Sequence, residues 1–234
     1  MRWNQFAVCL LAFVVAGFSS VAANAAMFIT EFMYRGDNAG GEFIELTNTG
    51  GAPIDMTGWS YDDNTNTPGS FSLSGFGIVA PGETVLITEA AAADFRTTWG
   101  LPGTIKVAGG SNQGIGNGDE INIYDGSNAL MDRLTFGSSV YPRTQERAAV
   151  PKILGALGTN THATNWEFTD LMAGGGVYDL SGVLPPNGWV TGIGGATGNP
   201  GYFQPVPEPT SIALAGIAVA GGVAMAIRRR KLAA

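Results

Sequence analysis

The sequence has few of the side chains from which common catalytic and metal sites are built. Its 234 residues include one cysteine, Cys9, and one histidine, His162. A single histidine excludes the zinc pattern of two histidines at helical spacing, and any histidine-dependent triad would need His162. No serine lies in a Gly-x-Ser-x-Gly turn. The sequence shows no carboxylate partner for His162, so we interpret this histidine as structural or solvated. The sequence therefore assigns no catalytic residue, and we expect that this protein is not an enzyme.

Basic residues are also scarce, at 12 Lys and Arg against 19 Asp and Glu. Five of the 12 lie near the ends of the chain, at Arg2 and at positions 228–231. Residues 26–209 retain seven basic and all 19 acidic residues, which is a net charge of −12. A surface this acidic repels phosphate backbones, so nucleic acid is not an expected partner.

Residues 1–25 have the organisation of a secretory signal peptide. A cation at Arg2 precedes an apolar stretch over residues 6–18, and the segment ends in Ala23-Asn24-Ala25. Signal peptidase accepts this small-x-small pattern, which predicts Ala26 as the new N-terminus; the alternative is a buried N-terminal helix. Cys9 lacks the context of a lipoprotein cysteine. Its removal with the segment would leave no cysteine for a disulfide or a thiolate metal site.

What the sequence does contain is glycine, at 35 residues, and short runs that favour strands over long helices. These runs predict strands at residues 27–34, 42–48, 53–63, 70–76, 84–89, 104–109, 120–126 and 129–137, the last two joined as a hairpin across residues 125–128. One short helix is predicted at residues 89–100, where Ala91, Phe95 and Trp99 recur at helical spacing. Short strands separated by turns at this spacing indicate a β-sandwich or a β-barrel.

Several motifs occur in an order that resembles the lamin-tail (LTD) domain family. They are Ile29-Thr30-Glu31, Ile44-Glu45-Leu46-Thr47-Asn48, Met56-Thr57-Gly58-Trp59 and Pro81-Gly82-Glu83, followed by Thr144 to Arg147, Asn165-Trp166 and Gly198-Asn199-Pro200-Gly201. The resemblance extends over residues 27–201. It implies an all-β fold, an immunoglobulin-like β-sandwich.

The C-terminal segment resembles the PEP-CTERM sorting signal of exosortase-bearing Gram-negative bacteria. Pro207, Glu208 and Pro209 precede an apolar run at residues 211–227, and Arg228, Arg229, Arg230 and Lys231 follow it. The prolines keep the chain extended for a processing enzyme, and the apolar run is long enough to cross a thin hydrocarbon core. The cations would stop translocation and remain cytoplasmic. A permanent single-span anchor is the alternative interpretation.

These patterns divide the chain into four parts. Residues 1–25 are the signal peptide, and residues 26–158 form the lamin-tail-like β-sandwich. Residues 159–205, rich in Gly, Thr, Asn and Pro, form the end of the domain and a linker, much of which we expect to be irregular or loosely packed. Residues 206–234 are the sorting segment.

Carboxylates are the abundant reactive side chains. Glu31 and Glu45 fall in strands that the family resemblance would bring together, and two close carboxylates could serve glycoside hydrolysis. The interpretation that we favour is structural: each accepts hydrogen bonds from the backbone or from an arginine, with Arg147 or Arg133 as the partner.

Two acidic loops offer oxygen ligands of the kind that Ca²⁺ prefers, Asp62-Asp63-Asn64 and Asn117-Gly118-Asp119-Glu120. Neither has EF-hand spacing, and turn-forming Asp and Asn explain both equally well. We therefore expect no bound cofactor, with Ca²⁺ as the one alternative.

Aromatic residues could provide a stacking surface for sugars. Trp59 follows a turn in the strand pattern, which favours a core position over an exposed one. Trp99, Trp166, Trp189 and Tyr202 are less constrained by the pattern. Arg35-Gly36-Asp37 is a short tripeptide to which we assign no role.

Taken together, the sequence predicts an exported, non-enzymatic surface or extracellular-matrix protein, processed by an exosortase-type enzyme and associated with exopolysaccharide. A carbohydrate- or Ca²⁺-binding adhesion module is the alternative, and a hydrolase is a weaker one. Exposed Trp and Tyr on one face would favour the adhesion module. Two carboxylates in a cleft would favour the hydrolase.

Overall fold

The computed structural model describes residues 26–34, 41–116, 118–137, 147–151, 157–158, 166–168, 190–191 and 196–203. The expected signal peptide (1–25), the sorting segment (206–234) with its apolar run 211–227, and most of the expected linker lie outside these residues. No helix in the described part of the chain is long and apolar enough to cross a membrane.

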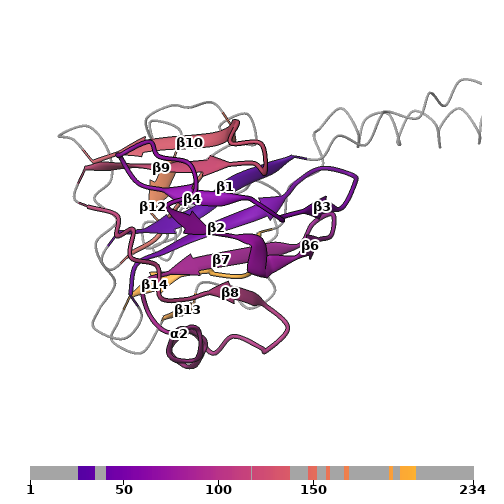
Figure 1. Ribbon diagram of the computed structural model, residues 1–234. Helices are drawn as coiled ribbons and strands as arrows, with labels where there is room; N and C mark the ends of the chain where they lie inside the picture. The colour runs from indigo at the N-terminus through magenta and orange to yellow at the C-terminus, as the bar shows by residue number, and fades with distance from the viewer. Residues whose placement is uncertain are drawn as a thin grey trace, which may run out of the picture.

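Two β-sheets form the body of the domain (Figure 1). The larger has the strand order β12-β11-β1-β2-β7-β8, and the smaller has the order β10-β9-β4-β5. The larger sheet consists of β1 (Met27–Met33), β2 (Phe43–Asn48), β7 (Thr84–Thr88), β8 (Lys106–Ala108), β11 (Ala149–Pro151) and β12 (Trp166–Phe168). The smaller sheet consists of β4 (Ser60–Asp62), β5 (Phe71–Ser72), β9 (Asp119–Tyr124) and β10 (Leu130–Phe136).

Neighbouring strands are antiparallel, with the exception of β7 and β8. The helix α2 (Ala92–Trp99) lies between these two in the chain, and parallel neighbours require such a crossover. Two small pairs complete the fold: β3 (Ile54–Asp55) with β6 (Ile78–Val79), and β13 (Val190–Thr191) with β14 (Thr197–Gly198). The predicted hairpin is confirmed, since β9 pairs with β10 across a turn closed by Asn128 N–H donating to the Asp125 carbonyl at 2.9 Å.

The main hydrophobic core lies between the two sheets. Alternate residues of the larger sheet, such as Ile29, Leu46 and Ile87, belong to one buried cluster with Ile121 and Leu134 of the smaller sheet. This period of two is the pattern from which the strands were predicted. Trp59 joins the same cluster with 8% of its surface exposed, so its predicted core position is confirmed.

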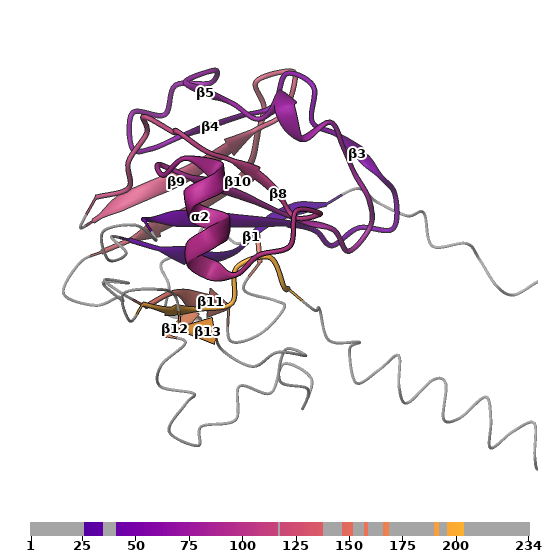
Figure 2. The same ribbon diagram turned by 90° about the horizontal axis from the view of Figure 1, so that it is seen from below.

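The opposite face of the larger sheet is covered by α2 and by the chain around β14 (Figure 2). Phe95 and Trp99 of α2 pack on Phe43 of β2, with ring centroids 5.6 Å apart in both pairs. The predicted short helix is therefore confirmed, with two of its three marker residues buried. The domain consists of two sheets with a second, smaller core behind the larger one.

Asp132 of β10 connects the two sheets at one side. Its side chain is 4% exposed, and its Oδ2 accepts a hydrogen bond of 2.8 Å from the backbone N–H of Ile29 in β1. The pairing of β1 with β2 shifts register between Ile29 and Glu31, and that of β9 with β10 shifts between Leu130 and Asp132. Asp132 thus satisfies a backbone donor where the register changes.

The strand predicted over residues 70–76 is wrong in its second half. β5 ends at Ser72, and residues 74–76 form a 3₁₀ turn (η1, Ser74–Phe76). The turn is closed by Phe76 N–H donating to the Leu73 carbonyl and Gly77 N–H donating to the Ser74 carbonyl, both at 3.1 Å. Leu73 and Phe76 are both buried, because residues three apart lie on the same side of a 3₁₀ turn, whereas they would point to opposite faces of a strand.

Most of residues 159–205, where the sequence predicts irregular or loose packing, lie outside the described residues, but several described residues near this end of the domain are packed. β11 and β12 extend the larger sheet beyond β1. Trp166, Ala196 and Asn199 are each at most 5% exposed. The turn-forming composition carried no information on what these described residues pack against.

Replacement of Trp59 by alanine should lower the free energy of unfolding by about 3–5 kcal/mol, because it removes buried area and leaves a cavity between the sheets. Chemical denaturation of the purified domain measures this. Ile78→Ala is the control, since Ile78 is 56% exposed and its truncation should have little effect. A loss below about 1 kcal/mol for Trp59→Ala would contradict the core assignment.

Candidate functional site

The two carboxylates singled out from the sequence face each other on neighbouring strands. Glu31 of β1 is paired in register with Glu45 of β2. Their side chains are 2% and 1% exposed, respectively, on the sheet face that α2 and the chain around β14 cover. The prediction that the fold brings these two residues together is confirmed.

Backbone donors from the chain around β14 hold both carboxylates. Asn199 N–H donates to Glu31 Oε1 at 2.8 Å, and Gly201 N–H donates to Glu45 Oε2 at 2.7 Å. The Thr30 hydroxyl donates to Glu45 Oε1 at 2.7 Å. The favoured interpretation, that these carboxylates accept backbone hydrogen bonds, is confirmed. Arg133 is not their partner, because it forms an ion pair with Glu120 at 3.5 Å.

Burial raises the pKa of both groups. The pKa of Glu31 lies well above its usual range because the carboxyl is desolvated and because Glu45 is close; the Asn199 N–H opposes this shift. Desolvation raises the pKa of Glu45 to about 7, against the hydrogen bonds from Thr30, Gly201 and Tyr202. Glycoside hydrolysis needs carboxyls that a substrate can reach. Since Glu31 and Glu45 are enclosed rather than placed in a cleft, their geometry favours a structural role.

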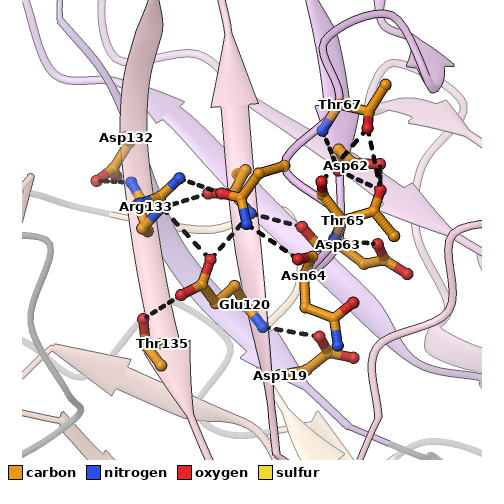
Figure 3. A network of polar contacts seen from close by, with 12 residues as sticks. Asp62, Asp63, Asn64, Thr65, Thr67, Asp119, Glu120, Asp132, Arg133 and Thr135 are labelled. Carbon is orange, nitrogen blue, oxygen red and sulfur yellow. Dashed lines mark hydrogen bonds and ion pairs between the residues drawn. The ribbon is translucent and has the colours of Figure 1, made fainter.

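The first acidic loop is a compact turn (Figure 3). Both carboxylate oxygens of Asp62, a fully buried residue, accept from the Thr65 hydroxyl, and Oδ2 also accepts from Thr67 N–H at 2.6 Å. Asp63 accepts from Thr65 N–H at 3.0 Å. Short Asp side chains that bond to the backbone a few residues onward stabilise turns. The turn-forming interpretation of this loop is thus the one that the hydrogen bonds support.

Two buried or half-buried side chains connect this turn to β9 and β10. Asn122, which is fully buried, donates from Nδ2 to the Asp63 carbonyl at 2.6 Å. Arg133 donates to the side chains of Asn122 and Asn66 and lies against Glu120 (Figure 3). The first acidic loop is therefore fixed over the start of β9, where the second acidic loop ends.

The two acidic loops line one open pocket of about 330 Å³. Its lining consists of Asn64, Asn66, Gly118, Asp119, Glu120, Thr135, Phe136 and Gly137. Asn117 lies outside the described residues. The sequence suggested each loop separately, and the fold brings them together. Within the described part of the chain, however, no three His, Cys, Asp or Glu side chains gather closely enough to hold a metal ion.

The carboxylate of Asp119 is occupied by its own loop. Gly116 N–H donates to Asp119 Oδ2 at 2.6 Å, and Glu120 N–H donates to Oδ1 at 2.9 Å. Ca²⁺ takes six to eight oxygen ligands, and the described lining offers few carboxylate oxygens that are not already bonded. The pocket is better suited to a small polar group than to Ca²⁺.

Sequence reasoning missed two further carboxyls. Burial raises the pKa of Glu42 to about 8, although its Oε1 accepts from Ile115 N–H at 2.6 Å. Burial likewise raises the pKa of Asp132 to about 6. In the sequence, Asp132 lies in a strand pattern that is typical of an outward-facing residue, and Glu42 directly precedes a strand. Nothing local in the sequence shows that other elements enclose them.

The aromatic candidates do not form an exposed platform in the described part of the chain. Trp59, Trp99 and Trp166 are buried, and Tyr202 is half-buried. Trp189, His162 and the tripeptide at residues 35–37 lie outside the described residues.

Comparison with protein families agrees with this architecture. The model of the Lamin Tail Domain family matches residues 20–138, half of the chain. The chain belongs to the Lamin Tail Domain family. A second model, of the PEP-CTERM protein-sorting motif, matches residues 205–231. A search of curated proteins finds no match.

The match to the lamin tail domain ends just after β10, whereas the folded structure continues. β11, β12 and residues 196–203 lie beyond the match, and they extend the larger sheet and supply donors to Glu31 and Glu45. In this chain the lamin tail domain is therefore completed by segments that follow the matched region.

The buried carboxyls should make the domain more stable in mild acid than at slightly alkaline pH. Glu31, Glu42, Glu45 and Asp132 all have a higher pKa in the folded protein than in the unfolded chain. The folded state then binds more protons between about pH 4 and pH 8, so the free energy of unfolding falls as the pH rises through this window. We expect Tm to be about 5 °C higher at about pH 5.5 than at about pH 8.

Calorimetry across this range tests the expectation, with Glu31→Gln as the diagnostic variant. Glutamine keeps an acceptor for Asn199 N–H and removes one of the two facing charges, so it should raise Tm at alkaline pH and flatten the pH dependence. Asp94→Asn removes an exposed charge from α2 and should retain the wild-type dependence. A Tm that falls on acidification through this range would contradict the assignment.

Calcium should stabilise the domain no more than sodium does at matched ionic strength. Binding to the folded state alone would raise Tm by mass action, whereas any cation screens the net charge of −12. Equal shifts of Tm in millimolar CaCl₂ and in matched NaCl are the expected result. A larger shift in calcium that Asp119→Asn removes would instead establish a calcium site at the pocket.

Proposed function

We propose that this chain is an exported bacterial surface protein whose lamin tail domain is delivered by its C-terminal sorting motif. The observation that carries the proposal is the pair of family matches, the lamin tail domain at residues 20–138 followed by the PEP-CTERM motif at residues 205–231. The second match implies processing by an exosortase-type system and sorting to the cell surface.

The route follows from the ends of the sequence. In this proposal residues 1–25 direct export, and residues 211–227 hold the precursor in the inner membrane of a Gram-negative bacterium. Arg228, Arg229 and Arg230 keep the end of the chain on the cytoplasmic side, because cationic segments flanking a membrane span remain inside. Pro207, Glu208 and Pro209 are the element that the processing enzyme reads.

The role at the surface is structural rather than enzymatic in this proposal. Its support is that the carboxylate pair on β1 and β2, Glu31 and Glu45, is enclosed and bonded to the backbone. An exported domain without a disulfide must derive its stability from packing, which two hydrophobic cores can supply. In this proposal, the partner of the domain is an exopolysaccharide matrix.

An adhesion module is the second candidate, and one observation favours it. The polar pocket between the two acidic loops has the size of a small ligand site. Its amide, hydroxyl and carboxylate groups could bond to a sugar, and the calcium titration described above tests the cation.

Replacement of Pro207, Glu208 and Pro209 together by alanine should leave membrane insertion intact, because hydrophobic length and flanking cations determine insertion. The protein should then accumulate as an uncleaved membrane species. Replacement of residues 228–231 by neutral residues should instead weaken retention or orientation. Membrane fractionation with an epitope tag placed after Ala26 distinguishes the two results. If the triple-alanine variant is processed and released like the wild type, the sorting assignment is wrong.

A further inference from the structure

Residues 196–203, which we call the strap, lie between the folded domain and the sorting motif. The strap contains the Gly198-Asn199-Pro200-Gly201 turn, and Ala196 and residues 198–201 are buried. A single residue separates Phe203, its last described residue, from the motif match at residues 205–231. Whatever holds the strap therefore also determines how far the motif can move from the domain.

Hydrogen bonds hold the strap along its length. Thr197 accepts at its carbonyl from Ala148 N–H at 2.8 Å, beside β11. Asn199 and Gly201 donate to Glu31 and Glu45, respectively, at 2.8 and 2.7 Å. The last two contacts connect residues that are 168 and 156 positions apart in the chain. The strap is thus attached to β1 and β2, the centre of the larger sheet.

The strap is also closely packed. A Cβ atom at Gly198 would lie 3.1 Å from Glu31 Oε1, 3.2 Å from the Trp99 ring and 3.3 Å from Ala148 Cβ. Ala196 is 2% exposed in the cluster that contains Phe95 and Trp99 of α2. A larger side chain at position 198 requires Glu31, Trp99 or Ala148 to move, and a charged one at position 196 would be buried in an apolar cluster, so both changes disfavour the strap in its place.

We infer that the strap is an autoinhibitory contact that restricts access of the processing enzyme to the sorting motif, an inference that rests on the proposed sorting function. From Phe203 to Pro207 the chain can extend about 13 Å, at about 3.3 Å per residue. Release of the strap would lengthen this reach to about 36 Å, measured from Ala196. At the shorter reach, the folded domain hinders a membrane-embedded enzyme that binds the extended motif. At the longer reach, the domain no longer hinders it.

Two variants release the strap by different means. Gly198→Val removes the space that the strap needs beside Glu31 and Trp99, and Ala196→Asp places a charge in the apolar cluster beneath α2. Gly103→Val and Ala93→Asp are the matched controls, because both positions are exposed and no atom lies near Gly103. The full-length protein is expressed with a tag after Ala26 in cells that contain the processing enzyme, and in cells that lack it.

Precursor from the cells without the enzyme, solubilised in detergent, is examined by hydrogen–deuterium exchange. We expect residues 196–203 to exchange about tenfold faster in the two strap variants than in the wild type and the controls. In the cells with the enzyme, pulse-chase labelling should show the two strap variants being processed severalfold faster than the controls.

Three results would overturn the inference: wild-type exchange at residues 196–203 as fast as in an unstructured chain, faster exchange without faster processing, or equal acceleration in the controls. A thermal unfolding transition shows whether each variant remains folded, and the strap variant that retains it decides the outcome. The triple-alanine variant at residues 207–209 separates the two hypotheses. If that variant is processed normally the sorting proposal fails, whereas a failure of the strap alone leaves the sorting proposal intact.

Discussion

Two buried carboxyl groups face each other on neighbouring strands of the larger sheet, and both need hydrogen-bond donors. This requirement explains how the C-terminal part of the domain packs on that sheet. Burial of a carboxylate is strongly unfavourable unless it is bonded or protonated. Glu31 and Glu45 obtain donors from Thr30 and from the backbone of Asn199 and Gly201. The outer face of the larger sheet is therefore covered by a segment that lies well beyond the part of the chain that the family model matches.

Two hydrophobic cores stabilise the larger sheet, one on each of its faces. The core between the sheets contains residues that alternate along β1, β2, β7 and β9, as in other β-sandwiches. The second core is built from the opposite face of β1, β2 and β7 together with Phe95 and Trp99 of α2. Strands that are buried on both faces explain why β2 and β7 contain no exposed residue. Polar groups within this layer, such as Thr47 and Thr84, are bonded to one another.

The acidic loops have a sequence that is compatible with a metal site, but in the fold the same residues stabilise turns. Asp62 and Asp119 direct their oxygens to backbone and hydroxyl donors within their own loops. Asn122 and Arg133 then connect the first loop to β9 and β10. Together the two loops form a polar rim around a pocket, a feature that neither loop has by itself.

By itself, the sequence determined most of the strands, the short helix, the hairpin at residues 125–128 and the core position of Trp59, and the family motifs implied the meeting of Glu31 and Glu45. The strands, the helix, the hairpin and the position of Trp59 rest on periodicity and turn chemistry, which are visible within a short window, and the meeting of Glu31 and Glu45 rests on the order of the motifs along the chain. Only the tertiary structure decided the partners of the buried carboxyls, because Ile29 and Asp132 are 103 positions apart and Glu31 and Asn199 are 168 apart. It also decided that residues 196–203 are packed rather than loose. A turn-rich segment has the same composition whether it lies in solvent or across a sheet, and the sheet face that it covers is assembled from distant strands.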